Sequence, residues 1–207
     1  MSITSKISAL PPFNDDTFWT DETSEHLRVA GDSFAQCRDD FFALLDLCEH
    51  SIRTGGKILF FGNGGSAADA QHLATELAVR YIKDRAPIAA LALTTDSSAL
   101  TAIGNDMGFE QLFARQISAI GKAGDVAIGI TTSGQSANVI AGLQAAQQGG
   151  LKAAALTGKD GGKLKDMALD ACLIVPSATT ARIQEMHITF GQMLCGALEQ
   201  KLGLTQG

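Results

Sequence analysis

The chain has 207 residues, of which 45% are hydrophobic and 18% are charged, and its formal net charge is -6 at pH 7. This length and composition predict one globular domain with a substantial core. The negative charge and the lack of a basic cluster argue against a surface built to hold nucleic acid. No apolar run reaches membrane-spanning length and no secretory signal pattern opens the sequence, so we expect a cytoplasmic protein.

The cysteines are too scattered to form a recognisable framework. No CxxC pair occurs, which argues against both a structural zinc site and a set of disulfides. We expect reduced thiols at Cys37, Cys48, Cys172 and Cys195.

The first quarter of the chain reads as a helical arm. Residues 1–16 show no clear period, and we expect them to be irregular. From about Asp21 to Thr54 the pattern is helical, with a break expected near Gly31 and an apolar stripe along Phe34–Ile52. The stripe must be buried, either on the protein's own sheet or on another subunit, and the sequence leaves both open. We therefore divide the chain into an N-terminal arm, 1–55, and a main unit, 56–207.

After Gly56, short apolar runs alternate with helical patterns. The runs are Lys57–Phe61, Ile88–Leu93, Asp125–Ile130, Lys152–Leu156 and Ala171–Val175. The helical patterns are Ser66–Tyr81, Ser97–Gly121 with an interruption near Gly104–Gly108, Ser136–Gln148, a short one around Leu164–Ala168, and Ala181–Leu202. This alternation predicts an α/β fold, a five-stranded parallel sheet with helices on both faces. Ligands of such folds bind outside the carboxyl ends of the strands, so the loops after the strands are candidate site loops.

The loop after the first run, Gly62–Ser66, is a glycine-rich turn that leads into a helix. A strand, a glycine turn and a helix N-terminus together favour an anion, although the turn is neither GxGxxG nor GxxxxGK[ST]. On the helix, His72, Glu76 and Arg80 recur every four residues and are predicted to share one face. Such a row is more often a solvated face with weak ion pairs. Its place behind an anion-binding turn favours a site for a small phosphorylated molecule.

The loop after the third run, Thr131–Ser136, offers four hydroxyls, a glycine and the start of the next helix. Hydroxyls and helix N–H groups bind a phosphate monoester without any lysine. A helix cap needs fewer hydroxyls, so the loop favours phosphate binding over capping alone. The loop Thr157–Gly162 is equally consistent with closing over a ligand and with an ordinary turn.

These motifs resemble those of the sugar isomerase (SIS) domain and, within it, the bacterial phosphoheptose isomerases. The resemblance runs from about Gly56 to Gly203 through GNGGSAADAQHLATEL, LTTDSSALTAIGND, GDVAIGITTSGQSANV, ALTGKDGG and VPSATTARIQEMH. It implies a flavodoxin-like SIS domain and conversion of sedoheptulose 7-phosphate to D-glycero-D-manno-heptose 7-phosphate, a step toward the heptose of lipopolysaccharide. It also implies a homotetramer with sites between subunits and, as in many members, bound zinc.

The resemblance also implies site residues, carried over position by position. The positions that match substrate contacts are Asn63, Gly64, Gly65, Ser66, Glu76, Asn105, Asp106, Thr131, Thr132, Ser133, Ser136 and Gln184, with the Ser and Thr residues forming a phosphate cradle. The positions that match zinc ligands are His72, Glu76, Gln184 and Gln192. Glu76 matches the catalytic base.

Gln192 departs from the family pattern, which has a histidine there as metal ligand and general acid. Helix geometry keeps Gln184 and Gln192 within about 80° of each other, so the position still faces the site. A glutamine amide cannot shuttle a proton near neutrality and is a poorer zinc ligand than imidazole. His187 lies about 140° from Gln192 around the helix, and we interpret it as a packed helix histidine.

Three explanations of Gln192 stay open. Another group or water supplies the acid, the residue was substituted to trap a ligand, or the chain binds sugar phosphates without isomerising them. In the first case Glu76 abstracts the proton beside the carbonyl to give an enediol, helped by a metal ion. The rival functions are a non-catalytic SIS protein that binds the bacterial replication initiator and an isomerase of another sugar phosphate. The presence of both His72 and Glu76 favours the enzyme.

Overall fold

A five-stranded sheet forms the centre of the computed structural model, which describes residues 13–205. The strands are β1 (Ile58–Gly62), β2 (Ala90–Ala92), β3 (Val126–Ile130), β4 (Lys152–Gly158) and β5 (Ala171–Val175). They lie in the order β2-β1-β3-β4-β5, and every neighbouring pair is parallel. β1 and β3 are buried at every residue, which is typical of a parallel sheet covered on both faces. The predicted fold class is confirmed.

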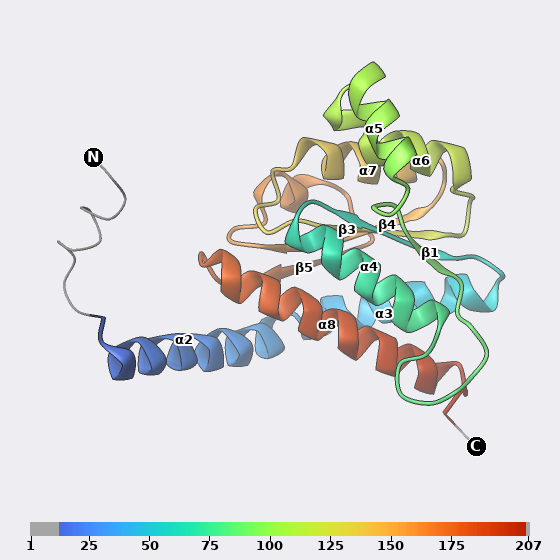
Figure 1. Cartoon of the computed structure of the whole chain (residues 1–207). Coiled ribbons are helices and arrows are strands. Elements are labelled where there is room, and N and C mark those ends of the chain that lie inside the picture. The colour runs from blue at the N-terminus through green and yellow to red at the C-terminus, as the bar shows by residue number, and fades with distance from the viewer. Residues whose placement is uncertain (1–12, 206–207) are drawn as a thin grey trace.

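Helices cover both faces of this sheet. They are α2 (Asp15–Gln36), α3 (Arg38–Arg53), α4 (Gly65–Ala78), α5 (Ser97–Asp106), α6 (Leu112–Ile120), α7 (Ala137–Gln148) and α8 (Thr180–Lys201), with short 3-10 helices η1 (Phe109–Gln111) and η2 (Gly162–Asp166). α3, α4 and α8 pack below the sheet in the view of Figure 1, and α5, α6 and α7 lie above it. Alternate residues of β1, β3, β4 and β5 enter two apolar cores, as Phe60 and Ile128 enter one and Phe61 and Ala127 the other.

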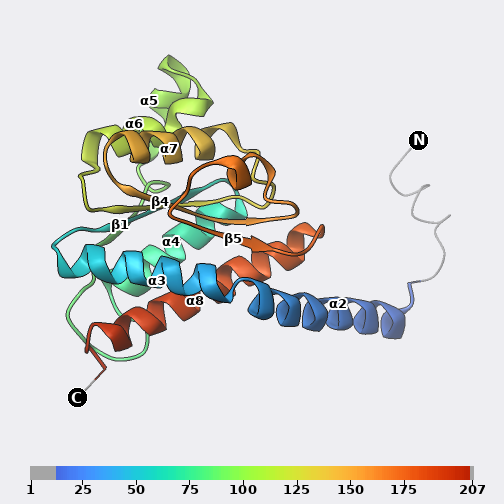
Figure 2. The same cartoon turned by 180° about the vertical axis from the view of Figure 1, so that it is seen from behind.

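The N-terminal arm splits into two helices with different surroundings. α3 buries Phe41, Leu44, Leu45 and Cys48 against the sheet and α8, so this part of the apolar stripe packs on the protein's own sheet. α2 projects from the body of the molecule, as Figures 1 and 2 show from opposite sides. In residues 13–205 no helix has the length and apolarity needed to cross a membrane.

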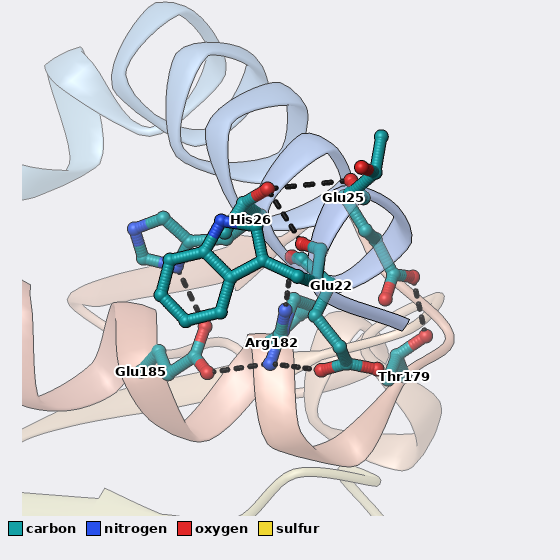
Figure 3. A network of polar contacts seen from close by, with 9 residues as sticks. Glu22, Glu25, His26, Thr179, Arg182 and Glu185 are labelled. Carbon is teal, nitrogen blue, oxygen red and sulfur yellow. Dashed lines mark hydrogen bonds and ion pairs between the residues drawn. The ribbon is translucent and has the colours of Figure 1, made fainter. Parts of the chain in front are cut away.

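Polar contacts tie α2 to the first turn of α8, as Figure 3 shows. Arg182 donates to the main-chain oxygen and the carboxylate of Glu22, and to the carboxylate of Glu185. The Thr179 hydroxyl donates to Glu25. The helix that begins at Thr180 is therefore held from the arm side at its N-terminus.

The predicted break in the arm is misplaced. α2 runs through Gly31 and ends at Gln36, and the break falls at Cys37, whose sulfur donates to the main-chain oxygen of Ile174 in β5. The break therefore coincides with a tertiary contact and not with the glycine. α2 also begins at Asp15, capped by the side chain of Asn14, so the irregular segment is shorter than expected. The remainder of that prediction, residues 1–12, lies outside the described residues.

The helix predicted over Ser66–Tyr81 also ends early. α4 stops at Ala78, and the Leu77 carbonyl accepts hydrogen bonds from the Ile88 main-chain N–H and the Arg85 guanidinium. Arg80 therefore lies outside the helix and does not continue the row of His72 and Glu76, which corrects that expectation. The short helical pattern near Leu164–Ala168 is the 3-10 helix η2, which begins two residues earlier.

Candidate active site

The strand order places a topological switch point between β1 and β3. The chain leaves β1 toward β2 on one side and leaves β3 toward β4 on the other, so the loops after these strands part at their carboxyl ends, the place where folds of this kind bind ligands. The register pairs Gly62 with Ile130, so both strands end at the same level. The two loops that the sequence singles out, Gly62–Ser66 and Thr131–Ser136, both start there.

A mutual amide pair joins these two loops. The Asn63 side-chain amide donates to the Asn138 oxygen, and the Asn138 amide donates back to Asn63, both at 2.8 Å. Asn138 is 2% exposed and lies in the first turn of α7. Sequence reasoning missed Asn138 as a site residue, although it lies inside the motif GITTSGQSANV, two residues after Ser136.

The glycine turn receives Gln184 from the last helix. A Cβ placed on Gly65 would lie 2.6 Å from the Gln184 amide nitrogen, so the side chain of Gln184 packs directly on the first turn of α4. Ser66 is buried beside it. No acidic residue stands in the first turn of α4. This helix N-terminus therefore keeps its favourable potential for an anion.

The hydroxyl loop does not use its hydroxyls as a helix cap. Ser136 is the N-cap residue of α7, but its side chain makes no cap hydrogen bond and instead lies 2.9 Å from the Thr131 hydroxyl. Thr132 and Ser133 are half-buried between them. The first N–H groups of a helix lack partners within it, so α7 offers free N–H groups beside this loop. The Thr131 and Ser136 hydroxyls bond to each other, and Ser133 Oγ accepts from the Gln135 main-chain N–H at 3.2 Å. This arrangement fits a phosphate group.

A second loop supports the hydroxyl loop from behind. Gly134 has φ +63, and a Cβ on it would collide with the main-chain oxygen of Gly161. The main-chain N–H of Lys163 donates to the Gly134 oxygen at 3.0 Å. The end of Thr157–Gly162 therefore packs on the hydroxyl loop, and its closing over a ligand stays a prediction.

His72, Glu76 and Gln192 converge across the contact of α4 with α8. The His72 Nε2 atom lies 3.1 Å from Glu76 Oε1 and 2.8 Å from the Gln192 amide nitrogen. One imidazole nitrogen cannot donate to the carboxylate and accept from the amide at once. Turning the Gln192 amide over presents its oxygen instead, and three electron-pair donors then point at one another. With a proton on His72 Nε2, the carboxylate and the amide oxygen both accept from it, and without that proton the three atoms could hold a cation.

The donor set suits a metal ion in part. His72 nitrogen and Glu76 carboxylate are ordinary zinc ligands, and the side chains are 48% and 24% exposed, so an ion can reach them. Within residues 13–205, no group of three His, Cys, Asp or Glu side chains gathers for a metal. The further donor beside them is therefore the Gln192 amide oxygen, which binds zinc more weakly than imidazole does.

Asn105 and Asp106 lie away from the other candidate residues. They end α5, which stands above α6 at the far side of the molecule from α8 in Figure 1. The Asn105 amide donates to the Asp106 carboxylate at 2.7 Å, and both residues are exposed. In the described part of the chain no hydrogen bond links them to the rest of the candidate site.

His187 is a packed helix histidine, as the sequence indicated. It is 1% exposed, and its Nε2–H donates to the main-chain oxygen of Thr157 at 3.0 Å. Its Nδ1 atom has no hydrogen-bond partner. Burial lowers the pKa of His187 to about 4, so the ring is neutral at pH 7. It does not replace the missing acid at Gln192.

His187 gives the fold a predicted sensitivity to acid. Its pKa is lower in the folded state than the ordinary 6.5, so the unfolded chain binds the extra proton and stability falls as pH drops from about 6.5 toward 4. We expect the free energy of unfolding to fall by about 2 kcal/mol between pH 7 and pH 5 from this group. Urea unfolding of the parent and of His187→Gln at both pH values measures it. Equal losses in the two proteins would remove His187 as the cause.

Comparison with known proteins places this geometry in a family. A family model described as SIS domain matches residues 25–158. The chain is 55% identical over 183 residues to the phosphoheptose isomerase of Paramagnetospirillum magneticum, with 88% of this chain and 95% of that protein covered.

Solved structures agree with the sequence match. The phosphoheptose isomerase structure from Neisseria gonorrhoeae superposes with a TM-score of 0.85 at 42% identity and covers 90% of this chain and 100% of its own. The one from Francisella tularensis superposes with a TM-score of 0.87 at 32% identity and covers 91% and 100%. With the sheet order, the two loops and these matches together, the chain belongs to the SIS-domain phosphoheptose isomerase family.

Proposed function

We propose that the protein interconverts sedoheptulose 7-phosphate and D-glycero-D-manno-heptose 7-phosphate, for the heptose of lipopolysaccharide. The observation that carries the proposal is the pairing of two loops at one switch point. The hydroxyl loop suits the phosphate, and the helix that starts in the glycine turn carries His72 and Glu76. The relatives that share most of the chain's length bear the name phosphoheptose isomerase.

In the proposed reaction Glu76 acts as the base. Its carboxylate takes the proton from the carbon beside the carbonyl, the C–H electron pair forms the C=C bond of an enediol, and the carbonyl oxygen gains a proton from water. Glu76 then returns its proton to the neighbouring carbon while the other oxygen loses one. The phosphate held in the hydroxyl loop aligns the reacting carbons from a distance.

Zinc is part of the proposal, with His72 and Glu76 as its stronger ligands and the amide oxygens of Gln184 and Gln192 as weaker ones. When bound, a zinc ion supplies a Lewis acid that polarises the sugar oxygens. Because an amide replaces imidazole at residue 192, we expect weaker zinc binding than a histidine would give. Gln192 also leaves the oxygens without an imidazole acid, so we expect slower proton transfer to them.

We further propose a cytoplasmic homotetramer with sites between subunits. Large apolar side chains on the outer part of α2 support a protein interface, since Phe18, Trp19 and Leu27 are 52%, 71% and 71% exposed. The exposed pair Asn105 and Asp106 lies away from its own site and is available to a neighbouring copy. Sedimentation of the purified protein tests the assembly, and a monomer at micromolar concentration would contradict it.

The second candidate function is a non-catalytic SIS protein that binds the bacterial replication initiator. The observation in its favour is Gln192, which removes the histidine that the reaction would use. A third candidate, isomerisation of another sugar phosphate, uses the same residues. The contacts of Glu76 and His72 favour an enzyme over a binding protein.

Turnover decides among these functions. We expect the purified chain to convert sedoheptulose 7-phosphate, faster with added zinc than after chelation. Sedoheptulose without the phosphate is the control substrate and should react far more slowly, because the remote anchor is lost. Binding of the sugar phosphate without conversion, together with capture of the replication initiator, would transfer support to the binding protein. Conversion of another sugar phosphate at a higher kcat/KM would identify the third candidate.

A further inference from the structure

An ion pair lies buried beyond the candidate active site, where α4 ends. The Arg85 Nε–H donates to Glu199 Oε1 at 2.7 Å, and the two side chains are 2% and 1% exposed. Within residues 13–205 no other ion pair buries both side chains to this degree. Burying two charges carries a desolvation cost, which their attraction repays only with good geometry and further hydrogen bonds.

Arg85 also caps the end of α4. Its Nη2 donates to the main-chain oxygen of Glu76 at 2.8 Å, and its Nη1 donates to that of Leu77 at 2.7 Å. Helix carbonyls in the last turn lack partners within the helix, and a cation there is favourable for the helix dipole. The residue proposed as the base is therefore held through its own backbone carbonyl by a guanidinium.

Glu199, on α8, also binds the chain just after the end of α4. Its Oε1 also accepts from the main-chain N–H of Tyr81 at 3.1 Å. Glu199 follows Gln192 by seven residues, so the two lie about 20° apart around the helix, on one face. On this face of α8, the Gln192 side chain contacts the His72 side chain. The Glu199 carboxylate binds Arg85, which in turn binds the carbonyls at the end of α4.

The two helices leave little room to slide. A Cβ on Gly191 would lie 2.5 Å from Leu73 side-chain atoms, so α8 packs directly on α4 one residue before Gln192. Figure 1 shows α4 and α8 side by side. The Arg85–Glu199 pair therefore joins α4 and α8 at one end of their contact. The cluster of His72, Glu76 and Gln192 joins the same two helices elsewhere along it.

We propose that Arg85 and Glu199 are positioning residues for the isomerisation, which hold the Glu76 backbone in register with Gln192 on α8. The proposal rests on the proposed function, because it assigns a purpose to the pair through Glu76. Neither residue touches the substrate. Loss of the Arg85–Glu199 pair displaces Glu76 from the reacting carbon. The hydroxyl loop, which lies between β3 and α7, is not changed.

Two variants test the pair. Arg85→Lys keeps the charge but loses the fork that reaches Glu199, Glu76 and Leu77 together. Glu199→Gln keeps the shape and one acceptor but removes the charge. We expect each folded variant to lose about tenfold in kcat, because small displacements of a reacting group are costly, while KM changes less than twofold. Glu199→Gln leaves the buried Arg85 cation without a carboxylate partner, which can prevent folding. Arg85→Lys keeps both charges, so the test still holds if Glu199→Gln does not fold.

The matched control is Asp125→Asn. Asp125 pairs with Lys57 at the opposite, amino-terminal edge of the sheet, and its side chain is 3% exposed. We expect this variant to lose thermal stability comparable to that of the test variants with kcat unchanged. An equal fall of kcat in the control, or kcat within twofold of the parent in both test variants, would overturn the proposal.

Crystal structures separate this proposal from the proposed function. In Arg85→Lys we expect Glu76 Oε1 to move out of hydrogen-bonding distance of His72, from 3.1 Å in the parent. An unmoved Glu76 overturns the positioning role whether or not the protein turns over. A parent that binds sugar phosphate without converting it overturns the proposed function, while the displacement still decides the role of the pair.

Discussion

Replacing Glu76 by glutamine is expected to lower kcat for sedoheptulose 7-phosphate by about a thousandfold, within the range for a general base. The amide keeps the size of the side chain and a contact to His72 but cannot accept the proton from carbon. Binding of the sugar phosphate should remain measurable, because the hydroxyl loop lies on β3 and α7 and is untouched. Steady-state kinetics and calorimetric titration with the substrate give the two quantities.

Glu49→Gln is the control for the chemical change itself. Glu49 lies on α3, where it contacts Arg53 and Lys201, and takes no part in the candidate site. We expect its kcat to equal that of the parent. Full activity in Glu76→Gln would rule out Glu76 as the base and leave the enediol step without a proton acceptor.

Gln192→His is expected to raise kcat by about a hundredfold and to tighten zinc binding. Imidazole in place of the amide supplies an acid whose pKa lies near neutrality, and a third strong metal donor beside His72 and Glu76. Turnover by the parent and the variant, each with and without zinc, and a competition titration with a zinc indicator measure both effects.

The outcomes of this comparison separate the readings of Gln192. A variant that alone turns over identifies the parent as an impaired isomerase. Equal turnover contradicts the prediction and means that the proton comes from another source. Failure of both proteins to convert the sugar phosphate they bind would favour the binding protein.

Hydrophobic periodicity predicted most of the fold. All five apolar runs form strands, because buried parallel strands require continuous apolar sequence and the intervening helices carry their own period. The errors lie where a distant residue decides. α4 ends at Ala78 under the influence of Arg85 and Ile88, and the arm breaks at Cys37 where its sulfur meets β5. No local pattern carries such contacts.

The sequence predicted the loops of the candidate site but not the side-chain contacts between distant residues. The glycine turn and the hydroxyl loop can be recognised from their composition, and the strand order places them side by side. The contact of Gln192 with His72 joins residues 120 positions apart, which no local pattern predicts. Asn138 is recognised as a site residue only once its hydrogen bonds to Asn63 are seen. Arg80 lies beyond the end of α4, and the pair Asn105–Asp106 lies away from the other candidate residues of the single chain.

The mutual hydrogen bonds between Asn63 and Asn138 hold the glycine turn and the start of α7 together. They tie the start of the helix that carries Glu76 to the first turn behind the hydroxyl loop, so these two parts cannot separate without breaking two hydrogen bonds at once. If the phosphate binds in the hydroxyl loop and Glu76 is the base, as proposed, we expect this fixed separation to favour sugar phosphates of one chain length.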